Sequence, residues 1–349
     1  MSWEENVRRV VPYTPGEQPD SGNKIKLNTN ENPYPPAPGV VKALAEIAPE
    51  QYSLYPDPQA SALRESLAAY EGVDTKQVFV GVGSDDVLAM AFLTFFNSKK
   101  PILFPDITYS FYDVWADLYR IPYETKPLRE DFTIDPSDYT GENGGIIFPN
   151  PNAPTGVLMP LAEVEQIVQA NKDVVVIVDE AYIDFGGVSA LCLLPRYENL
   201  LIVRTFSKSR SMAGMRIGYA IGNEKLIAYL EDAKFSFNSY TMNLPSLRAG
   251  VASVEDDAYF REKVEAVIAT REWTKEKLRG LGFTFPDSKS NFIFASHERV
   301  PAKELFLALR EKEIYVRYFE KPRIDNYLRI SIGTQEQMNT LIAFLEQYL

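Results

Sequence analysis

Lys208 is the residue of this sequence whose position most strongly suggests covalent chemistry. It follows the apolar run 200–203, and Arg216 comes eight residues later. A lysine at the end of a buried strand can lose its hydration, which lowers the pKa of its amine and makes it a nucleophile able to form a Schiff base. Because a hydrated surface lysine is the commoner situation, the position alone leaves both interpretations open.

Two further polar segments follow apolar runs in the same way. Asp179 follows the run 174–178; a carboxylate there either caps a helix or serves as the partner of a buried cation or ring nitrogen. Residues 81–86 follow the run 78–80 and contain two glycines before Ser84. Such a turn lets backbone N–H groups approach a phosphate at the start of a helix, but an ordinary capped turn has the same composition.

The apolar runs predict the element that positions these residues. They lack polar alternation, which is typical of strands buried on both faces. The runs are 78–80, 102–104, 146–148, 174–178, 200–203 and 217–221. Stretches of helical period separate them between about residues 42 and 222, so we expect an α/β layer with a mainly parallel sheet. Ligands bind at the carboxyl ends of the strands in such sheets, which is where the polar segments fall.

The chain after about residue 250 has a different pattern. It predicts a long helix, then short strands, then a final helix, over 254–281, 291–294, 315–318, 327–332 and 335–349. We interpret this part as a smaller α+β domain that the N-terminal arm can complete. The expected division is 1–41 for the arm and part of the small domain, 42–245 for the large domain, and 246–349 for the small domain.

Composition excludes several classes of protein. The chain has 349 residues, a net charge of −12 and 45% apolar residues. An acidic surface does not suit a general nucleic-acid or anionic-membrane partner. With Cys192 and His297 as the single cysteine and histidine, a disulfide framework or a Cys/His zinc site is excluded, and no metal site is expected. We expect His297 at the surface and, without a secretory signal or membrane span, a cytoplasmic location.

An ordered set of six motifs between about residues 27 and 333 resembles the fold-type-I pyridoxal-5'-phosphate (PLP) enzymes, specifically the class I/II aminotransferases. The motifs are Gly83-Ser84-Asp85, Thr108-Tyr109, the turn 150–156, Asp179-Glu180-Ala181-Tyr182, Ser207-Lys208 and Arg216. The resemblance implies a mostly parallel mixed sheet flanked by helices, a smaller α+β domain and a homodimer.

The resemblance also implies roles for residues around the cofactor ring. Lys208 would hold PLP as a Schiff base and move the proton between the substrate Cα and the C4' atom of the cofactor. Asp179 would pair with the pyridine nitrogen and keep it protonated. Tyr182 would hydrogen-bond the phenolic oxygen, and Tyr109 would stack on the ring.

The same resemblance implies a set of groups that bind the cofactor phosphate. They are the backbone amides of Ser84 and Asp85, the Ser207 hydroxyl, the Arg216 guanidinium and, from the neighbouring subunit, Tyr55.

One position departs from the family pattern, because Ala153 stands where an asparagine usually bonds the phenolic oxygen. Either Asn152 supplies that bond or Tyr182 acts alone.

Within the family, segments 27–33, 54–56 and 316–318 resemble the histidinol-phosphate aminotransferases of histidine biosynthesis. That resemblance implies transamination between L-histidinol phosphate and 2-oxoglutarate, giving imidazole-acetol phosphate and glutamate, or the reverse. Arg317 and Arg329 would bind the phosphate monoester of the substrate, and Tyr13 would close over it.

Three alternatives remain open at this point. Broad aromatic transamination and threonine-phosphate decarboxylation can use the same scaffold, since a shared fold says little about which bond at Cα breaks. A non-catalytic regulator that senses a ligand is less favoured, because only about 25 residues precede the segment 27–33.

Overall fold

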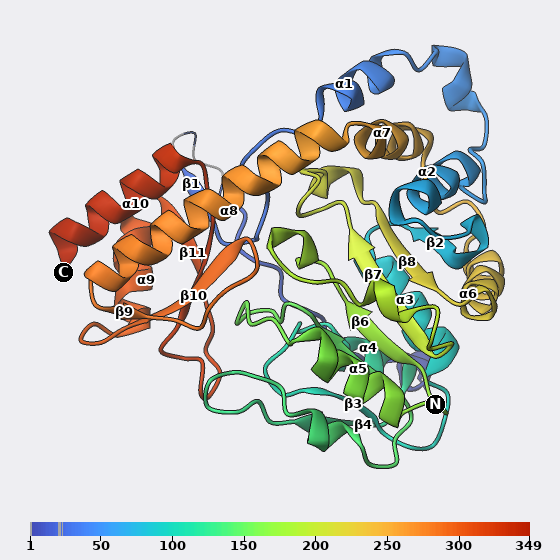
Figure 1. Ribbon diagram of the computed structural model, residues 1–349, viewed down its shortest axis with the longest axis horizontal. Helices are drawn as coiled ribbons and strands as arrows, with labels where there is room; N and C mark the ends of the chain where they lie inside the picture. The colour runs from blue at the N-terminus through green and yellow to red at the C-terminus, as the bar shows by residue number, and fades with distance from the viewer. Residues whose placement is uncertain (1, 20–21, 23) are drawn as a thin grey trace.

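The computed structural model describes residues 2–19, 22 and 24–349, and within these residues the larger of two sheets has seven strands (Figure 1). Its strands are β2 (Val78–Gly81), β3 (Ile102–Pro105), β4 (Tyr123–Lys126), β5 (Ile146–Pro149), β6 (Val176–Asp179), β7 (Leu200–Thr205) and β8 (Gly218–Gly222). Their order is β2-β8-β7-β6-β5-β3-β4. Neighbours are parallel except around β8, which is antiparallel to β2 and β7. The predicted mostly parallel mixed sheet is confirmed.

Helices cover both faces of this sheet. They are α1 (Pro38–Ala45), α2 (Ser61–Glu71), α3 (Ser84–Phe95), α4 (Tyr112–Tyr119), α5 (Leu161–Ala170), α6 (Glu224–Phe237) and α7 (Leu244–Glu255). Along β5, the side chains of Ile146 and Phe148 pack into one core with α2, α5 and α7. The side chain of Ile147 between them packs into the opposite core with α3, α4 and α6. Burial on both faces is why the strands show no polar alternation.

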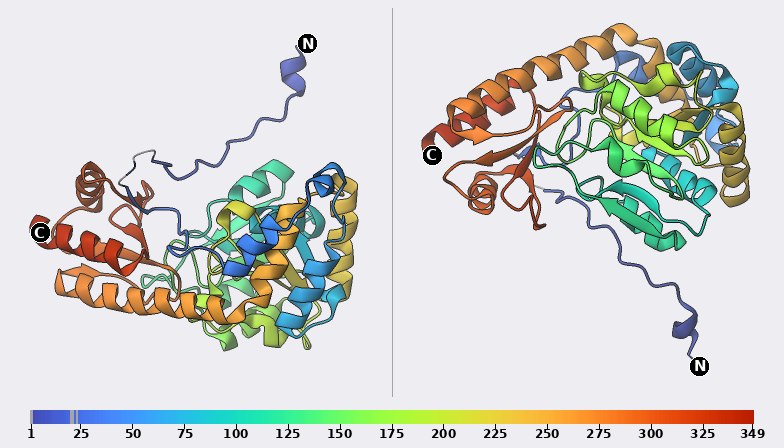
Figure 2. Two further views of the ribbon diagram at one scale, coloured as in Figure 1. Left: turned by 90° about the horizontal axis from the view of Figure 1, so that it is seen from above. Right: turned by 60° about the horizontal axis from the view of Figure 1, so that its bottom comes forward.

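The smaller sheet contains five described strands in the order β1-β11-β12-β10-β9. They are β1 (Ile25–Leu27), β9 (Phe283–Thr284), β10 (Phe292–His297), β11 (Ile314–Tyr318) and β12 (Leu328–Ser331), accompanied by α8 (Asp257–Gly280), α9 (Ala302–Glu311) and α10 (Gln335–Tyr348). β1 pairs with β11 in parallel, so the N-terminal arm does add a strand to this sheet. The described residues before β1 form an extended arm whose N-terminal end projects from the rest of the molecule (Figure 2).

Short 3-10 helices occupy several connections. They are η1 (Trp3–Asn6), η2 (Pro49–Ser53), η3 (Thr75–Gln77), η4 (Pro136–Tyr139), η5 (Ile183–Phe185), η6 (Ala190–Leu193) and η7 (Ala213–Met215). Among the described residues, no helix is long and apolar enough to cross a membrane.

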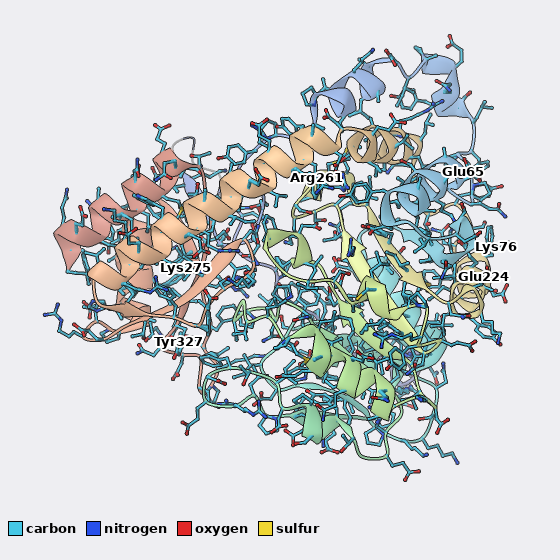
Figure 3. The ribbon with its side chains drawn as sticks, in the orientation of Figure 1. Glu65, Lys76, Glu224, Arg261, Lys275 and Tyr327 are labelled. Carbon is cyan, nitrogen blue, oxygen red and sulfur yellow. The ribbon has the colours of Figure 1, made fainter. Side chains whose placement is uncertain are left out.

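Two buried cations of α8 hold the loops next to the smaller sheet, and one of them also reaches the larger sheet. The Lys275 amine, labelled in Figure 3, donates hydrogen bonds to Asp287 at 2.8 Å and to the Ser288 carbonyl at 2.9 Å. One turn earlier, the Arg271 guanidinium donates to the Phe185 carbonyl at 2.7 Å and to the Ser290 carbonyl at 2.9 Å. Since Phe185 follows β6 and Ser290 precedes β10, Arg271 connects the loops of both sheets. Buried cations need such partners to offset their lost hydration.

The structure differs from the sequence-based expectation in an edge strand and in the start of a long helix. Strand β4 was not predicted, because its edge position leaves Tyr123, Glu124 and Thr125 exposed and removes the apolar run. The long helix expected over 254–281 is α8, but it begins at Asp257, and residues 254 and 255 end α7. Asp256 caps α8 by accepting a hydrogen bond from the Tyr259 N–H at 3.3 Å. Helix α7 packs against α1 and α2, and the division at residues 245/246 stays a prediction.

The expectation that His297 lies at the surface is wrong. Its side chain is buried at the end of β10, where its ring meets the edge of Phe283 with centroids 4.9 Å apart. Its Nε2 lies 2.9 Å from the Leu281 carbonyl oxygen, and its Nδ1 accepts the backbone N–H of Val300 at 3.0 Å. Both ring nitrogens therefore have structural partners, which the neighbouring charged residues in the sequence did not reveal.

Candidate active site

A pocket lies at the carboxyl ends of the central strands of the larger sheet. It brings together eight of the residues predicted to bind a cofactor, namely Ser84, Asp85, Tyr109, Asp179, Tyr182, Ser207, Lys208 and Arg216. They come from the ends of β2, β3, β6 and β7 and from the turn before β8. Because these strand ends share one edge of the sheet, residues more than 100 positions apart in the chain meet there.

Lys208 is half-buried and points into the pocket. Its amine donates a hydrogen bond to the Thr29 carbonyl at 3.2 Å and lies 5.7 Å from the centroid of the Tyr182 ring. The Asn32 side chain holds the backbone of the same turn by donating to the Lys208 carbonyl at 3.1 Å. The N-terminal segment around residue 30 therefore contacts both the amine and the backbone of this lysine.

Asp179 is a buried carboxylate at the end of β6. It accepts hydrogen bonds from the Tyr112 hydroxyl at 2.9 Å and from the Ala181 N–H at 3.1 Å. Burial raises the pKa of the Asp179 carboxyl to about 6, although these two hydrogen bonds act in the opposite direction. No lysine or arginine among the described residues pairs with it, so the carboxylate suits a cationic group supplied by a ligand.

An anion-binding cup lies at the other end of the pocket, where α3 begins. The Arg216 guanidinium donates to Asp85 at 3.0 Å and to the Ser207 hydroxyl at 3.4 Å. Gly83 has a φ of 84°, and a Cβ there would lie 2.4 Å from the guanidinium. Backbone N–H groups at a helix start and an arginine are the partners that a phosphate requires.

Tyr109 contributes both a ring and a hydroxyl to this cup. Its hydroxyl donates to Asp85 at 2.8 Å. Burial, followed by the negative charge of Asp85, raises the pKa of the Tyr109 hydroxyl well above its usual value, so the hydroxyl stays protonated. The carboxylate of Asp85 thus positions both Tyr109 and Arg216, a role that the sequence did not indicate.

The structure shows whether Asn152 can replace the asparagine that the family usually has at position 153. Ala153 lines the pocket, but the Asn152 side chain donates to the Ile107 carbonyl and to the Thr155 hydroxyl, both at 3.0 Å. Asn152 is therefore turned away, and the hypothesis that it bonds the cofactor is not supported. The Tyr182 hydroxyl instead accepts a hydrogen bond from Asn30 at 2.9 Å.

A second pocket adjoins the first and shares Tyr109 and Ala153 with it. Its other lining residues include Tyr13, Arg317, Phe319 and Arg329. Arg317 and Arg329 are directly opposite each other in the β11–β12 ladder, and both guanidinium carbons lie 5.6 Å from the centroid of the Phe319 ring.

The two arginines have few partners within the protein. Arg329 donates to the Asn28 carbonyl at 2.9 Å, whereas its buried Nε lacks a hydrogen-bond partner. Burial lowers the pKa of Arg329, and the positive charge of Arg317 acts in the same direction. No carboxylate pairs with either arginine in the described part of the chain. Like charges directly opposite each other are unfavourable, so this pair suits a bound anion.

The remaining two predicted residues lie at the periphery. Tyr13 stacks on Phe111 with ring centroids 4.2 Å apart, which holds the arm beside the second pocket. Tyr55 is 82% exposed and stacks on Tyr240 at 4.6 Å. It does not reach the pocket of its own chain.

The arrangement of these side chains fits PLP. The cofactor has a pyridine nitrogen that needs a carboxylate, a phosphate that needs a cationic cup, and an aldehyde that needs an amine. Asp179, Arg216 and Lys208 provide these three groups around one pocket. The carboxylate without a cationic partner and the glycine that admits Arg216 are the features that favour this fit.

Comparison with known proteins gives a consistent result. The family described as "Aminotransferase class I and II" matches residues 22–345. Histidinol-phosphate aminotransferase 1 of Hydrogenovibrio crunogenus is 53% identical over 99% of this chain and 98% of that protein. The histidinol-phosphate aminotransferase of Lactococcus lactis subsp. cremoris is 51% identical over 100% of this chain and 98% of that protein.

Solved structures share the fold at lower identity. The crystal structure of histidinol-phosphate aminotransferase from Clostridium acetobutylicum has a TM-score of 0.86 at 22% identity, covering 93% of this chain and 98% of that one. The enzyme from Sinorhizobium meliloti, in complex with pyridoxal-5'-phosphate, has a TM-score of 0.84 at 22% identity, covering 94% and 93%.

Proposed function

The chain belongs to the class I and II aminotransferase family, and we propose that it transfers an amino group between L-histidinol phosphate and 2-oxoglutarate with PLP as cofactor. The observation that carries the substrate assignment is the Arg317–Arg329 pair, which faces the second pocket and has no carboxylate partner in residues 2–19, 22 and 24–349. The identity of 53% to a histidinol-phosphate aminotransferase over nearly the whole chain supports the same assignment.

PLP, when bound, supplies an electron sink for the electrons left on the substrate Cα. The chain's own residues hold and orient it. Asp179 would keep the pyridine nitrogen protonated. The phosphate would be bound by the backbone amides of Ser84 and Asp85, the Ser207 hydroxyl and the Arg216 guanidinium.

Lys208 carries the proton-transfer role in this proposal. Its amine would hold the cofactor, and the same amine would act as the base and acid that moves a proton at the substrate Cα. The contact of its amine with the Thr29 carbonyl at 3.2 Å supports this role, because it limits the directions in which the amine can move.

Recognition of the substrate rests on charge. A phosphate monoester is a dianion, and two guanidinium groups can bind its oxygens through several charge-assisted hydrogen bonds. Tyr13, held by Phe111, lies beside these arginines and would cover the substrate and exclude water.

We also propose a homodimer that shares its active sites. Tyr52, Leu54, Tyr55 and Tyr240 are exposed apolar or aromatic side chains near the end of η2. A second copy that covered this patch would place Tyr55 at the neighbouring phosphate cup. A cytoplasmic location fits this biosynthetic role and the single, exposed Cys192.

The direct test is to add L-histidinol phosphate to the PLP-loaded enzyme and follow the visible absorbance of the cofactor. We expect conversion to the pyridoxamine form, and restoration of the original band on adding 2-oxoglutarate. Ready conversion by phenylalanine but not by histidinol phosphate would instead favour aromatic transamination. Release of carbon dioxide from threonine phosphate would favour the decarboxylase.

A further inference from the structure

The Tyr182 hydroxyl has a hydrogen-bond environment that leaves its proton without an acceptor in the protein. Among the described residues its one partner is Asn30, whose side-chain Nδ2 donates to it at 2.9 Å. The charged or titratable groups around it are Lys208, Arg329, Tyr109 and Tyr112, and none of them forms a hydrogen bond with it. Since a phenol that accepts one hydrogen bond still has a proton to donate, that proton is available to the pocket.

Asn30 is itself held in a defined orientation. Its backbone N–H donates to the Ser331 hydroxyl at 2.9 Å, and that hydroxyl donates back to Asn30 Oδ1 at 3.0 Å. Because Oδ1 is occupied in this way, the amide nitrogen faces Tyr182. The Asn291 side chain adds a third contact by donating to the Asn30 carbonyl at 3.0 Å.

The backbone at Asn30 also fits this residue type. Its φ is 58°, in the left-handed region, and asparagine is among the few residues other than glycine that adopt this region readily. The side chain is 1% exposed, so water does not compete for the contact with Tyr182. A buried asparagine in this conformation, bonded at both ends of its amide, is a rigid donor.

We propose that Asn30 is a positioning residue that directs the hydroxyl proton of Tyr182 toward the phenolic oxygen of PLP. The inference rests on the proposed function, because it assumes that PLP is the cofactor. It also explains how the site works with Ala153, which has no amide to donate to that oxygen. Asn30 acts through Tyr182 and does not need to touch the cofactor.

A pH titration of the visible absorbance of the PLP-loaded enzyme tests the proposal. Hydrogen-bond donation to the phenolic oxygen stabilises its ionised form and so lowers the pH at which the absorbance changes. Asn30→Gly removes the donor while keeping a residue that tolerates a positive φ. We expect this variant to raise the transition pH by about half to one unit.

Asn30→Asp sharpens the test because it keeps the shape of the side chain and replaces the donor with an acceptor. The Tyr182 proton would then be donated to the new carboxylate and be lost to the cofactor, so we expect a larger rise than in Asn30→Gly. Tyr182→Phe should raise the transition pH as well. In that background, Asn30→Gly should add little, since two residues that act through one hydrogen bond are not additive.

Asn28→Ala is the matched control. Asn28 is 3% exposed in the same segment, and its amide donates to the Glu17 carbonyl at 2.8 Å instead of to Tyr182. We expect no shift of the transition pH in this variant. If neither Asn30 variant shifts the transition pH while the wild type binds PLP and is active, the inference about Asn30 is wrong but the proposed function stands. Equal shifts from Asn30→Gly with and without the Tyr182 hydroxyl would also overturn the inference. If the PLP-treated wild type shows no cofactor absorbance, the proposed function itself is wrong.

Discussion

The cofactor pocket of the larger sheet and the arginine pocket of the smaller sheet both contain guanidinium groups, but they balance these charges differently. Arg216 has an internal counter-charge in Asp85 at 3.0 Å. Arg317 and Arg329 face each other across two strands and have no counter-charge among the residues that the structure describes. A site with an internal counter-charge keeps its geometry without a ligand. A site with two uncompensated cations gains most from binding a dianion, and for this reason we proposed it as the site for a phosphorylated substrate.

The largest expected effect comes from removing the nucleophile of the cofactor pocket. Lys208→Ala should reduce transamination by about 10³-fold or more, because both cofactor attachment and proton transfer are lost. Its folded structure should persist, measured by circular dichroism and thermal unfolding. Lys225→Ala, at an exposed position on α6, serves as the control with unchanged turnover. Retained turnover in Lys208→Ala would contradict the central assignment.

Asp179→Asn, in the same pocket, should raise the stability of the cofactor-free protein and lower its activity. The folded carboxyl binds its proton more tightly than the unfolded one, with a pKa of about 6 against an ordinary 3.8. Stability of the cofactor-free wild type therefore falls as the pH rises through this interval, by up to about 3 kcal/mol.

The variant cannot ionise at this position, so without cofactor it should unfold at a higher urea concentration than the wild type at pH 8. The two proteins should become similar below about pH 4. The variant should nevertheless lose most activity, because the pyridine nitrogen loses its carboxylate. Equal unfolding curves at pH 8 would contradict the buried, unpaired state of Asp179.

Arg317→Ala probes the second pocket and should behave differently. We expect kcat/KM for L-histidinol phosphate to fall by about 10- to 100-fold, which corresponds to losing hydrogen bonds to a charged group. Thermal stability without substrate should be unchanged or slightly higher, because a like-charge contact with Arg329 is removed. Arg299→Ala, an exposed arginine beside Glu298, is the control. An unchanged kcat/KM in Arg317→Ala would place the phosphate elsewhere.

The smallest expected effect comes from restoring the family asparagine. Ala153→Asn would add a second donor near the phenolic oxygen, and we expect it to lower the pH of the absorbance transition by about half a unit. The measurement is the same titration that tests Asn30. A rise would mean that the new side chain displaces the Tyr182 hydroxyl.

The local sequence pattern was sufficient to predict the elements that depend on residues close together in the chain. Apolar runs without polar alternation predicted six of the strands of the larger sheet, and the polar segments noted after three of these runs, 78–80, 174–178 and 200–203, line one pocket. Such predictions succeed because a strand buried on both faces must be apolar throughout, and because parallel strands end at one edge. Strand β4 was missed because an edge strand carries no such constraint.

Long-range contacts could be found only in the folded chain. Asn30 meets Tyr182 across 152 residues, and Tyr112 meets Asp179 across 67. Asn152 turns toward Ile107, and His297 is buried although charged residues follow it. Sequence order thus predicted the fold and most of the residues that meet in the pocket, whereas tertiary packing decided the direction of each hydrogen bond. The physical reason is that a polar side chain takes whichever buried partner the fold brings to it, and that partner has no fixed distance along the chain.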